Sequence, residues 1–283
     1  MYTSSQPRII ITAQRQSGRT GLRELVSYRE LIWAMTRKNY IIRYKQTVLG
    51  IAWAFIRPLF TALVMSVAFG QILGLKTDGL PGLLFYLCNM SLWGFFSESV
   101  RSNSRLFLDN AALFGKIYFP RLVMPISNLL LNMMTLGIQI LMLTGFVVCY
   151  SIQGALDVSL QLWPLMIPVV LITGAIGMSF GVIVSSLTTR YRDLNMLVDF
   201  AIQLWMYATP VVYPLSQVQN PVFRRLLLLN PMTSLMECFR KIFLGSGCIQ
   251  VTGLLWTCIF AVLSAVLAVH LFYRIESTFL DTV

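Results

Sequence analysis

Charged residues are scarce in this chain, and their scarcity excludes a soluble domain. Only 12% of the 283 residues are charged and 57% are hydrophobic, whereas soluble proteins carry roughly 25% charged residues. A soluble fold could not hide that much apolar surface from water. The sequence therefore predicts an all-α integral membrane protein, for which lipid is part of the solvent.

The common motifs of nucleotide and metal chemistry are also missing. The chain has no GxxxxGK[ST] motif, whose backbone N–H groups would cradle phosphates, and no glycine-rich dinucleotide motif. It has one histidine, and its five cysteines show no CxxC spacing. We therefore expect no catalytic site, no metal site and no cofactor in this chain.

Acidic residues are nearly absent from the apolar stretches. Glu98 and Asp199 both lie near the ends of such stretches, and none of the stretches contains a pair of carboxylates. Carriers driven by protons or sodium ions usually place acidic residues near the middle of the membrane. Membrane enzymes need acid–base residues or a metal ion. The sequence therefore argues against a self-powered carrier and against an enzyme.

Long runs without charge make up most of the chain. A helix needs about 20 apolar residues to cross a bilayer, whereas barrel strands would alternate with a period of two over about ten residues. The runs that predict six transmembrane helices are Gly50–Leu75, which contains Arg57 as its only charged residue, and the charge-free Leu80–Ser97, Leu122–Leu156, Val158–Thr189, Phe200–Phe223 and Ile242–Tyr273.

The basic residues are distributed unevenly between the two sides of this arrangement. With both termini inside, 17 of the 22 Lys and Arg residues fall in inner segments and five in outer segments. Because basic residues favour the cytoplasmic side, we expect a multi-pass protein of the cell inner (cytoplasmic) membrane with cytoplasmic N- and C-termini. The net charge of +11 then indicates contact with anionic membrane lipids and not with nucleic acid.

The N-terminal region divides into a tail and an amphipathic helix. Arginines interrupt residues 1–27, so no cleaved signal peptide is expected. Residues 28–49 predict a helix in the membrane interface, with a solvated linker helix as the alternative. Its apolar face would contain Tyr28, Leu31, Ile32, Met35, Asn39, Ile42, Gln46 and Leu49. The expected organisation is a cytoplasmic tail (1–27), this interfacial helix (28–49), a six-helix membrane domain (50–275) and a second cytoplasmic tail (276–283).

The segment between the fifth and sixth runs contains apolar pieces that are too short to span. Asn230 is placed to cap a helix that begins at Pro231, and this helix would be about 20 Å long. Within it, Glu237 would face Arg240 and Lys241, three and four residues further on. The preceding Val222–Leu229 is also short, so the sequence predicts a re-entrant helical hairpin on the outer side, surrounded by protein or by a water-filled cavity.

Two inner loops have patterns that suit contact with a partner. In residues 98–121, Asp109 and Asn110 are good caps for a short helix at Ala111–Phe114. Such a helix would dock a partner or simply connect two spans. The second loop, Thr189–Asn195, is a tight turn of mixed charge.

Aromatic residues are densest in the first, second and fifth runs. Lipid-facing packing and interfacial belts explain most of them. Flat rings with polar tips also suit the apolar C–H faces of sugars, so a path for a glycan is a second interpretation. The candidates for lining such a path are Trp53, Phe60, Trp93, Trp205, Tyr207 and Tyr213.

Five motifs follow one another in an order that is typical of one family. They are RYKQTVLGIAWAFIRPL (Arg43–Leu59), NAALFGKIYFPRLVMP (Asn110–Pro125), TRYRDLN (Thr189–Asn195), LNPMTSLMECFRKIFLG (Leu229–Gly245) and ESTFLDTV (Glu276–Val283). Over residues 28–283 the chain resembles the permease subunits of type-2 ABC transporters that export O-antigen, capsular or teichoic acid polysaccharides.

The resemblance implies a function and a set of partners. The chain would be the transmembrane subunit of an ATP-driven exporter that moves a lipid-linked polysaccharide, of the O-antigen type first of all, across the cytoplasmic membrane. It would form a homodimer with two copies of a separate cytoplasmic ABC ATPase. The partner would bind ATP and Mg and hydrolyse ATP, which agrees with the missing phosphate-binding motif in this chain.

The resemblance also implies roles for individual residues. A coupling helix at residues 110–118 and the turn at 189–195 would contact the ATPase, and residues 222–245 would form outer gate helices. The implied ATPase-coupling residues are Asn110, Ala111, Leu113, Phe114, Lys116, Arg190, Arg192 and Asp193. The implied gate residues are Arg224, Arg225, Asn230, Pro231, Glu237 and Arg240.

Two other functions are alternatives. A lipid or multidrug exporter of the same permease class is the first alternative. A long soluble outer loop or a fused ATPase would favour it, and the sequence shows neither. A membrane enzyme that handles polyprenyl phosphates would need acidic pairs on inner loops, whereas Asp109, Asp193 and Asp199 are scattered.

Overall fold

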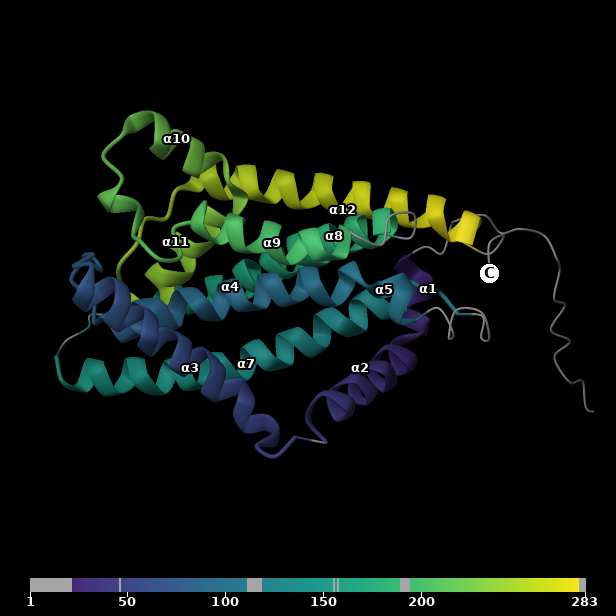
Figure 1. Ribbon diagram of the computed structural model, residues 1–283, viewed down its shortest axis with the longest axis horizontal. Helices are drawn as coiled ribbons and strands as arrows, with labels where there is room; N and C mark the ends of the chain where they lie inside the picture. Colours follow the sequence, from purple (N-terminus) through teal and green to yellow (C-terminus); the bar gives the residue numbers. More distant parts are fainter. Residues whose placement is uncertain are drawn as a thin grey trace, which may run out of the picture.

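The long helices of the molecule lie roughly parallel to one another. The computed structural model describes residues 22–45, 47–110, 119–154, 156, 158–188 and 194–279, and every regular element in them is helical. Four helices extend along the longest axis (Figure 1): α4 (Gly82–Ser104), α7 (Val123–Ile152), α8 (Met166–Thr188) and α12 (Val251–Phe279). The predicted all-α fold is confirmed for the described residues.

Among the described residues, four segments are long and apolar enough to cross a membrane. They are Gly50–Ile72, Val123–Ile152, Leu160–Thr188 and Val251–Ile275. The first joins η1 (Gly50–Ala52), α3 (Trp53–Met65) and the π-helical η2 (Ser66–Ile72), and the third begins with η3 (Leu160–Leu165). The helix α9 (Leu194–Tyr207) is shorter.

The fifth and sixth predicted runs are not continuous helices. In Phe200–Phe223, the helix α9 ends at Tyr207, and Pro210, which has no backbone donor, prevents its continuation. In Ile242–Tyr273, Gly245 ends the helix α11 in the left-handed conformation with φ of 70°, which glycine adopts without steric cost. The next helix starts only at Val251, so both predicted limits were wrong.

The helix α4 lies at the centre of the bundle. It packs against α3, α7, α8, α9 and α11, and its polar side chains Asn89, Ser91, Ser99 and Asn103 are buried. The helix α8 approaches it closely through small residues. A Cβ atom at Gly181 would lie 2.6 Å from the Val100 carbonyl oxygen, so only glycine permits this backbone contact.

The predicted amphipathic helix is present as α2 (Arg29–Tyr44), preceded by the short α1 (Leu22–Ser27). It packs against α7, and Leu31, Ile32 and Met35 join an apolar cluster there. Ile42 of the predicted apolar face is exposed, and Arg43, which was placed outside that face, lies toward α4 and α7.

The side of α2 that packs on protein contains polar residues, because α7 and α4 offer polar partners to Asn39 and Arg43. Asn39 Nδ2 donates to Asn128 Oδ1 at 3.2 Å.

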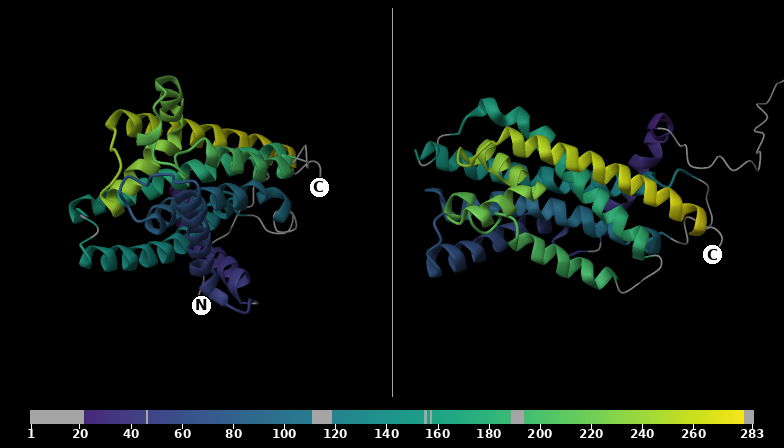
Figure 2. Two further views of the ribbon diagram at one scale, coloured as in Figure 1. Left: turned by 60° about the vertical axis from the view of Figure 1, so that its left-hand side comes forward. Right: turned by 90° about the horizontal axis from the view of Figure 1, so that it is seen from above.

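The two predicted short helices after α9 are confirmed. A single turn, η4 (Leu215–Gln217), leads into α10 (Pro221–Leu229) and α11 (Pro231–Leu244). These two helices lie at the opposite end of the long axis from α1 and the short α5 (Leu106–Asp109) (Figures 1 and 2). We call the end with α10 and α11 the hairpin end and the end with α1 and α5 the tail end.

Candidate functional site

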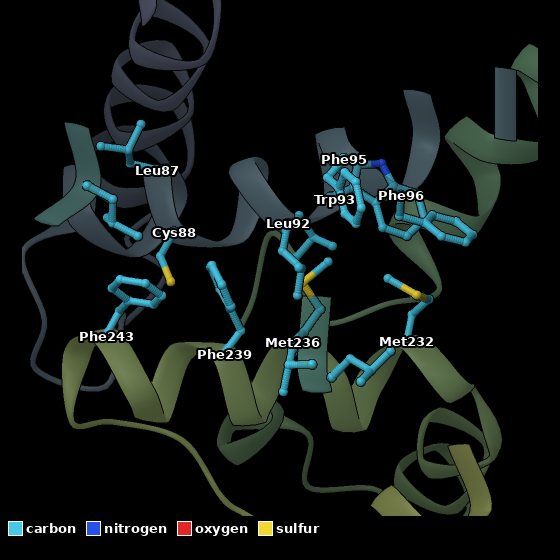
Figure 3. Packing of buried hydrophobic residues seen from close by; sticks show 14 of the residues in the cluster. Leu87, Cys88, Leu92, Trp93, Phe95, Phe96, Met232, Met236, Phe239 and Phe243 are labelled. Atoms are coloured by element: carbon cyan, nitrogen blue, oxygen red, sulfur yellow. The ribbon is translucent and has the colours of Figure 1, made fainter. Parts of the chain in front are cut away.

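The helix α11 is enclosed by the rest of the bundle. Every residue from Pro231 to Arg240 is buried, and the helix packs against α4, α7, α8, α12 and η3. Figure 3 shows Met232, Met236, Phe239 and Phe243 of α11 facing α4, with the Cys88 sulfur pointing toward the two phenylalanines. A helix that is too short to span is thus buried in protein, as the predicted hairpin requires.

The pair Glu237 and Arg240 is buried inside this apolar interface. Arg240 Nη2 donates to Glu237 Oε1, and both side chains are almost completely inaccessible, at 0% and 5% exposure. The other carboxylate oxygen, Oε2, accepts from the Cys248 backbone N–H at 3.1 Å. The guanidinium group also lies over the Phe85 ring, 5.1 Å from its centroid.

The predicted contact between Glu237 and Arg240 is therefore confirmed. It also explains part of the unusual basic charge in this segment, because the charge of Arg240 is neutralised by Glu237. The neighbouring Lys241 donates instead from Nζ to the Gly245 carbonyl oxygen at 2.6 Å, so it stabilises the C-terminal end of α11.

Several buried polar atoms near α11 have no hydrogen-bond partner within the described part of the chain. They belong to α11 itself, to the first half of α4 and to η3: Tyr86 Oη, Asn89 Oδ1, Trp163 Nε1, Thr233 Oγ1, Ser234 Oγ and Arg240 Nε and Nη1. Buried groups of this kind are rare in folded proteins and costly. A rearrangement of α11 could therefore give them partners that they lack in this conformation.

Asn230 joins α9 to the two short helices. Its Oδ1 caps α11 by accepting from the Met232 backbone N–H at 3.0 Å, and it also accepts from Trp205 Nε1 at 3.1 Å. Its Nδ2 donates to the Ala208 carbonyl oxygen at 2.9 Å and to Thr209 Oγ1 at 2.8 Å. The predicted cap is confirmed, and one side chain fixes the end of α9 to the start of α11.

A second polar cluster, formed by the second halves of α2 and α4 and the first half of α7, was not predicted. Arg43 Nη2 pairs with Glu98 Oε1 at 2.9 Å, and Arg43 Nη1 donates to Asn132 Oδ1 at 3.3 Å. Asn132 Nδ2 donates to Ser102 Oγ at 3.0 Å, and Asn128 Nδ2 donates to the Ser102 carbonyl oxygen at 3.1 Å. The helix α4 is thereby attached to both neighbours.

A sequence signal for this cluster existed. Asn128, Asn132 and Thr135 recur at spacings of four and three inside an otherwise apolar run, which places them on one face of a helix. Charge alone was used to delimit the runs, so this stripe of uncharged polar residues was overlooked.

The predicted path residues fall into two groups. Trp93 is buried beside Phe96, and Trp205 is held by ring contacts to Phe96 and Phe180 at 5.1 and 5.0 Å. Trp53, Phe60 and Tyr207 are instead on the surface of the single chain. Tyr213 is half-buried and donates from its hydroxyl group to the Tyr207 carbonyl oxygen at 3.1 Å. The structure does not bring the six residues together.

The predicted ATPase-coupling residues are almost all outside the described residues. Ala111, Leu113, Phe114, Lys116, Arg190, Arg192 and Asp193 belong to this group. Asn110 is described, and its side-chain N–H donates to the Leu106 carbonyl oxygen at 2.9 Å, at the end of α5. Asp109 is the last residue of α5, and its predicted role as a cap stays a prediction, because the helix predicted at Ala111–Phe114 lies outside the described residues. The gate arginines Arg224 and Arg225 are exposed on α10.

The described residues contain no group of His, Cys, Asp and Glu side chains that could hold a metal ion. What they offer is a set of apolar helices, a buried ion pair at one end and a polar cluster at the other.

Comparison with known proteins gives consistent results over most of the chain. A model of the ABC-2 type transporter family matches residues 30–244. The O-antigen export system permease protein RfbA of Myxococcus xanthus is 31% identical over 228 residues, which are 78% of this chain and 83% of the relative. Two proteins of the same name from Klebsiella pneumoniae are each 27% identical over 218 residues, which are 76% of this chain and 81% of each relative.

Proposed function

The chain belongs to the ABC-2 type transporter family, and from this premise we propose that it is the membrane subunit of an ATP-driven exporter of an O-antigen-type polysaccharide. The observation that carries the proposal is the similarity to O-antigen export permeases over more than three quarters of the chain. The cargo would be linked to a lipid, and it would cross the inner membrane.

Energy for transport would come from a separate ATPase. The chain carries no phosphate-cradling motif, so two copies of a cytoplasmic ABC ATPase would bind and hydrolyse ATP with Mg. Residues 110–118 and the turn at 189–195 would contact them. The attachment of α4 to α2 and α7 supports this proposal, since residues 110–118 follow closely after α4 and α5.

Six crossings are compatible with the helices, although among the described residues four segments are both long and apolar enough to span a membrane by themselves. The helix α4 has 23 residues, which at 1.5 Å each is long enough to span a bilayer. Its polar residues are buried against neighbouring helices and would not meet lipid. The fifth crossing would combine the shorter α9 with the turn that follows it, and both termini would be cytoplasmic.

The cargo would pass between two copies of the chain, with α10 and α11 as outer gate helices. Exposed rings at Trp53, Phe60 and Tyr207 support a path along the surface of each copy, because sugars stack on aromatic faces. The unpartnered polar atoms around α11 support a gate that rearranges.

Deletion of the gene in its host tests this function. We expect surface O-antigen to disappear and lipid-linked polysaccharide to accumulate on the inner face of the membrane, as measured by immunoblot of intact and opened cells. The cloned gene should restore display only when its partner ATPase is active. Normal display in the deletion strain would refute the proposal, and accumulation of a drug or simple lipid instead would favour the other exporter class.

A further inference from the structure

One charged residue in the apolar segments has no partner among the residues that the structure describes. The four segments that could span a membrane contain only two Lys, Arg, Asp or Glu residues, Arg57 and Arg274. Arg274 lies next to the end of its segment and does interact with another group. The side chain of Arg57 is exposed, and in the described part of the chain it forms no hydrogen bond or ion pair. Its backbone carbonyl oxygen accepts a hydrogen bond from Thr61 Oγ1 at 2.8 Å.

Arg57 is placed between two exposed aromatic residues on α3. Trp53 precedes it by four residues and Phe60 follows it by three, so at 100° per residue the three lie within about 60° of one another. Trp53 is 45% and Phe60 is 62% exposed. The opposite side of α3, with Ala54 and Ala62, is buried against the bundle.

This position would be unfavourable for a charge that remained unpaired. Arg57 lies seven residues after Gly50, about 10 Å along the helix axis, and unpaired charges at such depth are costly and usually have a function. A guanidinium group is always charged, and its planar set of donors matches the oxygens of a phosphate group. Apolar rings on either side suit the hydrocarbon chain of a lipid that carries such a phosphate.

We propose that Arg57, together with Trp53 and Phe60, forms a site for the phosphate group of the lipid that carries the polysaccharide. This inference rests on the proposed function, since it assumes a lipid-linked cargo. A bilayer phospholipid offers the same chemistry, a phosphate at the boundary between polar and apolar parts. The test must therefore separate cargo lipid from bulk lipid.

Binding measurements on the full-length chain in nanodiscs of phosphatidylcholine provide this test. The probes are a fluorescent polyprenyl diphosphate and the matching polyprenol without phosphate. Arg57→Gln should weaken binding of the diphosphate by about tenfold and leave polyprenol binding unchanged. Arg57→Lys should retain part of the affinity, because lysine keeps the charge but loses the planar donor set.

Arg37→Gln is the matched control, because Arg37 is an exposed arginine of the adjacent helix α2 and should not affect either probe. Equal diphosphate binding by wild type and Arg57→Gln, at equal thermal stability, would overturn the site. Displacement of the probe by phosphatidylglycerol as readily as by unlabelled polyprenyl diphosphate would assign the site to bilayer lipid and overturn the cargo assignment.

The outcome is independent of the test of the proposed function. If the deletion strain still displays O-antigen, the proposed function fails, whatever the nanodisc affinities are. If display depends on the gene while Arg57→Gln binds the diphosphate normally, only the phosphate site fails.

Discussion

The two ends of α4 differ in how their buried polar groups are satisfied. In its second half, Ser99, Ser102 and Asn103 are linked through hydrogen bonds to Asn128 and Asn132 of α7. In its first half, Tyr86 Oη and the side-chain oxygen Oδ1 of Asn89 have no partner in the described part of the chain. The same is true of Nε and Nη1 of Arg240 in α11.

This difference suggests that α4 is fixed to its neighbours at one end and is less firmly fixed at the end that contacts α11. A satisfied polar network fixes one arrangement of its helices, whereas unsatisfied groups gain if the helices rearrange. The tail-end half of α4 would therefore act with α2 and α7 as a unit. At the hairpin end, α11 is held by its packing against the bundle and by Asn230, while the Glu237–Arg240 pair lies within α11 itself.

The largest effect is expected from Glu237→Leu. This change leaves the buried charge of Arg240 without its counter-ion, which should reduce the free energy of unfolding by about 3–5 kcal/mol. Thermal unfolding in detergent and the amount of protein in the membrane are the measurements.

The double variant Glu237→Leu with Arg240→Leu is the matched control. It removes both charges, so a large part of the lost stability should return. If the double variant is no more stable than Glu237→Leu alone, the loss does not come from the unpaired charge of Arg240.

A smaller effect is expected from Asn230→Ala, and Asn220→Ala serves as its control. Both asparagines cap a helix that starts with proline, but only Asn230 also binds Trp205, Ala208 and Thr209. Loss of an exposed cap costs about 1 kcal/mol, and the additional hydrogen bonds should raise the cost at Asn230 to about 2–3 kcal/mol. Equal shifts in melting temperature would show that the junction of α9 and α11 is not stabilised by this side chain.

The smallest effect is expected at the exposed pair between α4 and α9. Arg101 Nε lies 2.6 Å from Asp199 Oδ1, but the two side chains are 44% and 68% exposed. A double-mutant cycle with Arg101→Gln and Asp199→Asn should give a coupling energy below about 1 kcal/mol. A value similar to that for Glu237 and Arg240 would remove the distinction between buried and exposed ion pairs in this molecule.

The sequence predicted the helical class and the local helix signals well. Asn230, Pro231 and Gly245 begin and end α11 as expected, because capping depends on neighbouring residues only. The prediction for α2 considered only its position in the membrane interface and did not foresee that one side of it packs against α7. In a membrane protein the outward face is apolar as well, so polar residues such as Arg43 are often the ones that pack inward.

The arrangement of the candidate site could not be read from the sequence. Trp93 and Trp205 were predicted to line a path on the same grounds as Trp53 and Phe60, yet the first two are packed among other rings. Which side of a helix is covered depends on its neighbours, and that information is tertiary. Whether the exposed rings line a path stays a prediction.

Reconstituted transport tests the central claim most directly. The chain and its partner ATPase would be placed together in lipid vesicles with lipid-linked O-antigen on the ATPase side, and the glycan that reaches the lumen would be measured by its protection from an added glycosidase. The account predicts protection that requires ATP and both chains and that is lost when the ATPase is inactivated. Protection without ATP hydrolysis, or equal protection in vesicles that lack this chain, would contradict it.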